Sequence, residues 1–108
     1  MKVRSGGKVH FDYVIAYRQA IGIVDLKALD RFMKTNDVDK LLLIAENPLT
    51  QGTINYLNDL SWKEKVEVVV TDRLLKTVSE LKKKYREKEI KVINLDEFGE
   101  RPFQYDSC

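Results

Sequence analysis

The sequence predicts an α/β fold in which a β-hairpin is followed by βα units, giving a mixed four- to five-stranded sheet flanked by helices. Two observations carry this prediction. Short apolar runs rich in β-branched residues alternate with longer segments whose apolar residues recur at helical spacing. The run Leu41–Ala45 is apolar at every position, which is typical of a central parallel strand covered on both faces. With 108 residues in the chain, we expect one domain over 1–98 and an irregular tail over 99–108.

The chain opens with two apolar segments, 1–4 and 9–17, separated by Ser5-Gly6-Gly7-Lys8. A Gly-Gly turn adopts the positive φ that a tight hairpin requires, so the two segments are predicted to pair antiparallel. One face of the second strand is aromatic and β-branched and is expected to be the buried one; it carries Val9, Phe11, Tyr13, Ile15 and Tyr17. The other face carries His10, Asp12, Val14, Ala16 and Arg18.

The middle of the chain alternates helices and strands. A helix is predicted over about 24–35 because apolar residues recur on one stripe, namely Leu26, Leu29, Phe32 and Met33. After the strand Leu41–Ala45, Thr50 is expected to cap a second helix. This helix presents three apolar side chains at helical spacing, namely Ile54, Leu57 and Leu60.

The last part of the chain repeats this pattern. Val66–Thr71 is a β-branched strand, and Asp72 is expected to cap the helix that follows it. The apolar stripe of this helix consists of Leu74, Val78, Leu81 and Tyr85. Ile90–Leu95 is predicted to be the last strand.

Composition excludes several classes of protein. Cys108 is the single cysteine, so a disulfide scaffold is excluded. The longest strong apolar run, Leu41–Ala45, is far shorter than the roughly 18 residues of a membrane span, and residues 1–7 lack the apolar core of a signal peptide. The glycines of Ser5-Gly6-Gly7-Lys8 and Gln51-Gly52-Thr53 do not form a phosphate-binding loop. We therefore expect a cytoplasmic protein without membrane contact and without a nucleotide cofactor.

Charge is uneven along the chain although the net charge is only +2. Residues 1–19 sum to +3, residues 72–93 to +4 with eight Lys or Arg against four acids, and residues 94–108 to −3. If the fold brings the two basic segments together, they form a positive face that suits a polyanion. The alternative is a solvated helix face on which both signs are intermixed.

Two groups of polar residues are candidates for chemistry. His10 and Asp12 lie on the same strand face and could begin a metal or acid–base site, although two ligands do not make one; otherwise they form a polar strand edge. Glu46 follows the central strand at its carboxyl end, where α/β sheets bind ligands, or belongs to a polar turn. These patterns assign no catalytic residue and no metal site.

Several segments between residues 9 and 80 carry a family resemblance. Tyr13–Arg18 resembles a catalytic strand that typically runs Val-Val-Gln-x-Lys-Arg, and Val24–Lys34 resembles the helix after it. Leu41–Thr50, with Asn55-Tyr56, resembles the strand and helix start that come next. Val66–Thr71, with Leu74-Leu75, resembles the closing strand and helix. This order is similar to the Mrr-like branch of the restriction-endonuclease (PD-(D/E)xK) fold.

The departures from that family bear on activity. The family holds Mg²⁺ and activates the attacking water with an Asp on the preceding strand and with a Glu or Gln placed two residues before a Lys. The positions of the Glu or Gln and of the Lys fall here on Ile15 and Tyr17. Neither side chain can supply the charge that phosphodiester hydrolysis needs. Met1–Arg4 carries no acid, and Asp12 lies on the opposite strand face from Ile15. The resemblance therefore implies a nuclease-like fold without its active site, with Ile15 and Tyr17 packed inward.

Three functional hypotheses follow. The first is a catalytically inactive domain that binds DNA or RNA, or sits in a nucleic-acid-processing assembly. Its phosphate contacts would come from Arg18, Lys82, Lys83, Lys84 and Arg86, assisted by Lys2, Arg4 and Lys8. The second is a protein-interaction module, such as a homodimer, that uses the edge of the hairpin or the aromatic segment Phe98–Tyr105. The third is a metal-dependent nuclease that uses His10, Asp12 and Glu46.

Overall fold

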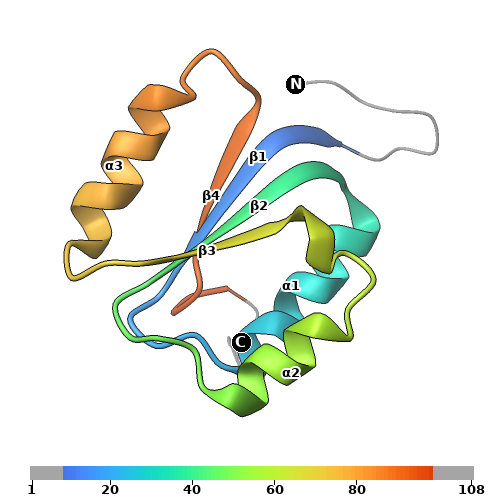
Figure 1. Cartoon of the computed structure of the whole chain (residues 1–108). Coiled ribbons are helices and arrows are strands. Elements are labelled where there is room, and N and C mark those ends of the chain that lie inside the picture. The colour runs from blue at the N-terminus through green and yellow to red at the C-terminus, as the bar shows by residue number, and fades with distance from the viewer. Residues whose placement is uncertain (1–8, 99–108) are drawn as a thin grey trace, which may run out of the picture.

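The computed structural model describes residues 9–98, and within this range helices and strands alternate (Figure 1). The elements in chain order are β1 (His10–Tyr17), α1 (Ile23–Thr35), β2 (Asp37–Ala45), α2 (Gln51–Asn58), the 3₁₀-helix η2 (Lys63–Lys65), β3 (Val66–Val70), α3 (Leu74–Lys84) and β4 (Ile90–Asn94). The predicted α/β class is confirmed. Each predicted element over 9–98 is present, and β2 begins at Asp37, four residues before the apolar run that predicted it.

The four strands described form one sheet in the order β3-β2-β1-β4, and every neighbouring pair is parallel. After β3 the chain crosses back through α3 to place β4 on the far side of β1. Right-handed crossovers in opposite directions put the helices on opposite faces. Accordingly α1 and α2 cover one face of the sheet and α3 covers the other (Figure 1). The antiparallel partner expected over Met1–Arg4 lies outside the described residues, so the hairpin and the mixed sheet stay predictions.

Both faces of β1 are buried, which corrects the expectation that only one face would be. Ile15 lies in the core beneath α3, as predicted, and Tyr17 is half-buried beside it. Val14 and Ala16, on the face expected to be exposed, are also completely buried, in the core beneath α1. The prediction was wrong because β1 is an interior strand with helices on both sides, where alternation does not separate inside from outside.

The alternation of β1 slips once, between Phe11 and Val14. These two side chains pack in the same core although three positions separate them. At this point the backbone N–H groups of Asp12 and Tyr13 both donate to the carbonyl oxygen of Glu89, at 2.7 and 3.2 Å. Two donors on one acceptor mark a local bulge, which reorients the side chains at the start of the strand.

The helix starts confirm one predicted cap and correct the other. The Thr50 hydroxyl accepts a hydrogen bond from the Thr53 N–H at 3.3 Å, as expected of an N-cap. Asp72 does not cap α3: the N-cap position is Arg73, which makes no side-chain capping bond. Instead the Thr71 hydroxyl accepts from the Arg73 N–H at 3.0 Å. Both Thr71 and Asp72 are suitable residue types, so the sequence alone does not separate them.

Candidate functional site

The carboxyl ends of β1 and β4 form the topological switch point of the sheet, where open α/β sheets bind ligands. An open cavity of about 690 Å³ lies at this end, between the strand ends and the start of α3. Its charged lining consists of two cations and two carboxylates, namely Arg73, Lys76, Glu46 and Asp96. Glu46 therefore lies where the sequence placed it, but the balanced charges select no ligand class.

Arg18 lies at the same end and is held by ion pairs. Its guanidinium donates from Nη1 to Asp25 Oδ1 at 2.8 Å and from Nε to Asp96 Oδ1 at 3.0 Å. Asp25 is 3% exposed and also accepts the Gly22 N–H at 2.9 Å. Arg18 thus ties the start of α1 to the turn after β4. Its charge is directed at two carboxylates of its own chain.

The other predicted phosphate-binding residues lie at the opposite end of α3. Because α3 spans eleven residues, the helix is about 16 Å long. Lys82, Lys83 and Lys84 form its last turn and Arg86 follows it. The structure therefore brings these four together and separates them from Arg18. Lys2, Arg4 and Lys8 lie outside the described residues.

A further cation, Lys88, extends this group, and we call the five residues Lys82, Lys83, Lys84, Arg86 and Lys88 the basic surface. All five side chains are exposed, and none forms an ion pair in the part of the chain that the structure describes. Over residues 82–89 these five cations face two acids. Lys88 was not predicted as a contact, although the basic composition of residues 72–93 was a signal for it.

The surface is fixed to the sheet by an aromatic pair. The ring of Tyr85, directly after α3, stacks on Tyr13 of β1 with centroids 4.0 Å apart. Lys84 Nζ lies 5.3 Å from the Tyr85 ring centroid, within the range of a cation–π contact. Aromatic stacking therefore holds the end of α3 at a defined position on β1.

The amino ends of β1 and β2 bring His10 and Asp12 together with a third residue. His10 Nε2 lies 3.2 Å from Asp39 Oδ2 and 3.7 Å from Asp12 Oδ1. His10 and Asp12 were predicted as candidates from the sequence, whereas Asp39, which is 27 positions after Asp12, was not. In the sequence, Asp39 is recognisable only as an aspartate shortly before an apolar strand. The register of β1 and β2 is what brings it next to His10 and Asp12.

Glu46 is not part of this group. The register puts Asp12 beside Asp39, and Glu46 comes seven positions later along the same strand direction. At about 3.3 Å per residue the separation is roughly 23 Å. The structure therefore does not bring Asp12 and Glu46 to one metal ion, as the nuclease hypothesis required.

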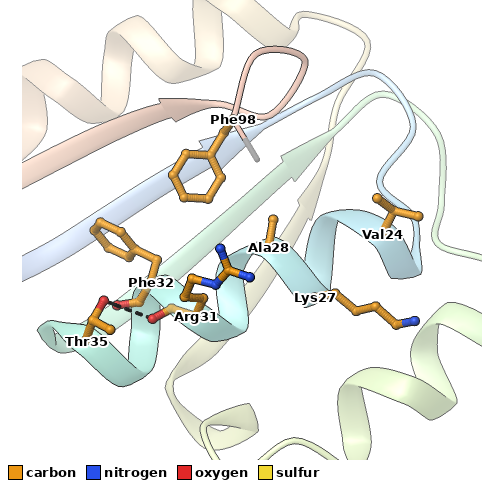
Figure 2. A pocket seen from close by; sticks show the side chains of 7 residues that line it. All are labelled: Val24, Lys27, Ala28, Arg31, Phe32, Thr35 and Phe98. Carbon is orange, nitrogen blue, oxygen red and sulfur yellow. Dashed lines mark hydrogen bonds between the residues drawn. The ribbon is translucent and has the colours of Figure 1, made fainter. Parts of the chain in front are cut away.

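Phe98 belongs to the fold rather than to a free segment. Its ring packs edge-on against Phe32 of α1 with centroids 6.0 Å apart. The two rings border an open cavity of about 490 Å³ along the outer side of α1 (Figure 2). Of the aromatic residues proposed for partner docking, Phe98 is thus packed against its own chain, and Phe103 and Tyr105 lie outside the described residues.

No protein-family model, no curated protein and no solved structure matches this chain. Among residues 9–98, no helix is long and apolar enough to cross a membrane.

Proposed function

We propose that this protein binds nucleic acid, DNA or RNA, through the basic surface. The observation that carries the proposal is the grouping of five exposed cations, free of ion pairs within residues 9–98, at one end of the molecule. Phosphates attract such unpaired charges and release counterions when they bind. Lysine and arginine ammonium and guanidinium groups are the usual partners of phosphate oxygens.

Helix stability explains only part of this charge. Cations in the last turn of a helix interact favourably with its dipole, by about 0.3–1 kcal/mol each. This accounts for Lys82, Lys83 and Lys84, which form the last turn of α3. Lys88 lies four residues beyond the end of α3, where this effect has faded, so its charge supports a role in binding an anion outside the chain.

The proposal is tested by reversing the charge of the surface. We expect Lys82→Glu, Lys83→Glu and Lys84→Glu together to abolish binding to a fluorescent duplex DNA and to a single-stranded RNA, measured by anisotropy at about 50 and about 200 mM salt. The matched control reverses three exposed cations elsewhere, Lys27, Lys63 and Lys65. Both variants change the net charge equally, and both should keep the circular dichroism spectrum of the parent.

Wild-type binding should weaken with salt, with a slope of about 0.9 per phosphate contacted. In the control variant the slope should be that of the parent. Equal losses in the two variants would mean that net charge alone attracts the nucleic acid. Absence of wild-type binding at low salt would refute the proposal.

We propose in addition that the fold is restriction-endonuclease-like. A restriction-endonuclease-like domain without its active site would retain nucleic-acid affinity and would not cleave. Ile15, at a position where the resembling family holds its metal, is completely buried beneath α3. We therefore expect both nucleic acids to remain intact on incubation with Mg²⁺ or Mn²⁺.

A second candidate function is self-association through the sheet edge at β3. Among the strands described, β3 pairs only with β2. Val68 and Val70 of this strand are 39% and 48% exposed, as suits pairing with the same strand of a second copy. Light scattering should then show a dimer that Val68→Lys dissociates and that Val24→Lys on α1 leaves intact. A monomeric parent would exclude this candidate.

A further inference from the structure

We propose that His10, Asp12 and Asp39 bind one divalent transition-metal ion of the zinc class at the amino ends of β1 and β2. One potential ligand atom from each residue lies within 4.8 Å of the other two. The imidazole nitrogen is 3.2 Å from one carboxylate oxygen and 3.7 Å from the other. Ligands about 2.0–2.1 Å from a tetrahedral zinc ion are roughly 3.3 Å apart, so an ion fits between these atoms with small side-chain movements.

The pairing of β1 with β2 brings these three residues together. His10 and Asp12 are two positions apart on β1, and their side chains approach to 3.7 Å between Nε2 and Oδ1. The register pairs Phe11 with Val38 and Tyr13 with Lys40, which puts Asp39 directly beside Asp12 on β2. Like charges in directly opposed strand positions are destabilising, so a cation between Asp12 and Asp39 would stabilise the sheet at this point.

Asp12 is oriented from outside the group. Its Oδ2 accepts the backbone N–H of Glu89 at 3.0 Å, which leaves Oδ1 directed at His10. Glu89 also binds the β1 backbone through its carbonyl oxygen, so the start of β4 fixes this ligand. A carboxylate held by a backbone donor is the outer-shell arrangement that orients metal ligands.

The proposed site is open to solvent on one side. The His10 side chain is 13% exposed, whereas that of Asp39 is 61% exposed. An ion can therefore enter from solvent beside Asp39 and be held against the imidazole. Three protein ligands leave a coordination position for water.

The donor set selects the class of metal. One imidazole nitrogen with two carboxylate oxygens suits Zn²⁺ and its transition-metal neighbours, whereas Mg²⁺ prefers oxygen ligands only and keeps most of its water. We therefore expect Zn²⁺ to bind more tightly than Mn²⁺, and Mg²⁺ more weakly than either.

The test exploits the fact that His10 is the one histidine of the chain. The full chain, without a histidine tag and with Cys108→Ser to remove its one thiol, is titrated with ZnCl₂ by calorimetry at about pH 8, because metal affinity increases as protons leave the ligands. The imidazole nitrogens are followed by NMR. We expect one ion per chain and a change in the Nε2 signal.

Variants identify the ligands. His10→Gln should abolish binding, and Asp39→Asn should weaken it about tenfold or more. Asp39 is exposed, so its variant also serves if His10→Gln does not fold. The matched control is Asp72→Asn, an exposed aspartate before α3, which should bind zinc like the parent.

Three results would overturn the proposal: no saturable binding, an unchanged His10 signal at saturation, or Asp39→Asn and Asp72→Asn with equal affinities. The measurement uses the metal alone. A failure of the metal proposal can therefore be distinguished from a failure of the proposed nucleic-acid binding.

Discussion

The two faces of the sheet are packed very differently. In the part of the chain that the structure describes, the core beneath α1 and α2 contains fourteen buried residues, and the core beneath α3 contains four. α1 contributes three residues to its core, Leu26, Leu29 and Met33, whereas α3 contributes Val78 alone. Buried apolar area is the main source of stability, so the first face holds the fold together and the second carries a lightly attached helix.

This difference explains where charge can be placed. A helix that packs through a narrow apolar stripe leaves most of its surface in water. In α3 this exposed surface carries the lysines of the last turn. These lysines are exposed, so changing them should leave the core intact. The face that is least important for folding is thus the one free to carry a binding surface.

The largest expected effect is on the α1 face. Leu43→Ala removes a completely buried side chain from the centre of β2 and should lower the free energy of unfolding by about 2–5 kcal/mol. Urea denaturation measures it. As a control, Leu75→Ala removes a side chain on α3 that is 67% exposed and should change stability by less than about 0.5 kcal/mol. A Leu43→Ala effect as small as the control would contradict the assignment of the main core.

A matched pair of valines compares the two faces directly. Val78→Ala on α3 and Val38→Ala on β2 each remove two methyl groups, worth about 1.5 kcal/mol of transfer free energy. Val38→Ala should lower the free energy of unfolding more than Val78→Ala. The cavity left at Val38 lies between the sheet and helices that cannot move to fill it, whereas α3 can move toward the sheet. Hydrogen exchange should also show faster opening of α3 in Val78→Ala. Equal losses of stability in the two variants, without local opening of α3, would mean that the two faces contribute equally to the stability of the fold.

The sequence predicted what depends on local pattern and missed what depends on pairing. The helix 24–35 and its buried stripe were predictable because helical spacing is visible in one segment. The burial of Val14 was not, because it depends on how the helices divide between the two faces: α1 covers Val14, and α3, about 60 residues later in the chain, covers Ile15. The ion pairs of Arg18 and the approach of Asp39 to His10 have the same origin. Side chains from distant segments meet only once the strand order is known.

The smallest expected effect concerns a polar connection on the α1 face. The Trp62 indole donates to Asp30 Oδ1 at 2.7 Å, and Lys34 Nζ lies 3.1 Å from Asp30 Oδ2. The hydrogen bond from Trp62, and then Lys34, lower the pKa of Asp30 against the opposing effect of burial. Within residues 9–98, α3 takes part in no comparable hydrogen bond to a tryptophan or ion pair. Removing the Asp30 contacts therefore tests a feature of the α1 face only.

Because the pKa of Asp30 is lower in the folded chain than the roughly 3.9 of an unfolded aspartate, its interactions stabilise the fold above about pH 4. The stabilisation is lost as the pH falls through the folded pKa. Lys34→Gln should therefore cost about 0.3–0.5 kcal/mol at neutral pH, as expected for an i,i+4 pair, and nothing once Asp30 is protonated. The fluorescence of Trp62, the one tryptophan, should report the Asp30 titration, with the pKa shifted upward in the variant. Lys27→Gln, an exposed change on the same helix, should leave that pKa unchanged; an equal shift in both variants would show that general surface charge, rather than the Lys34 contact, sets it.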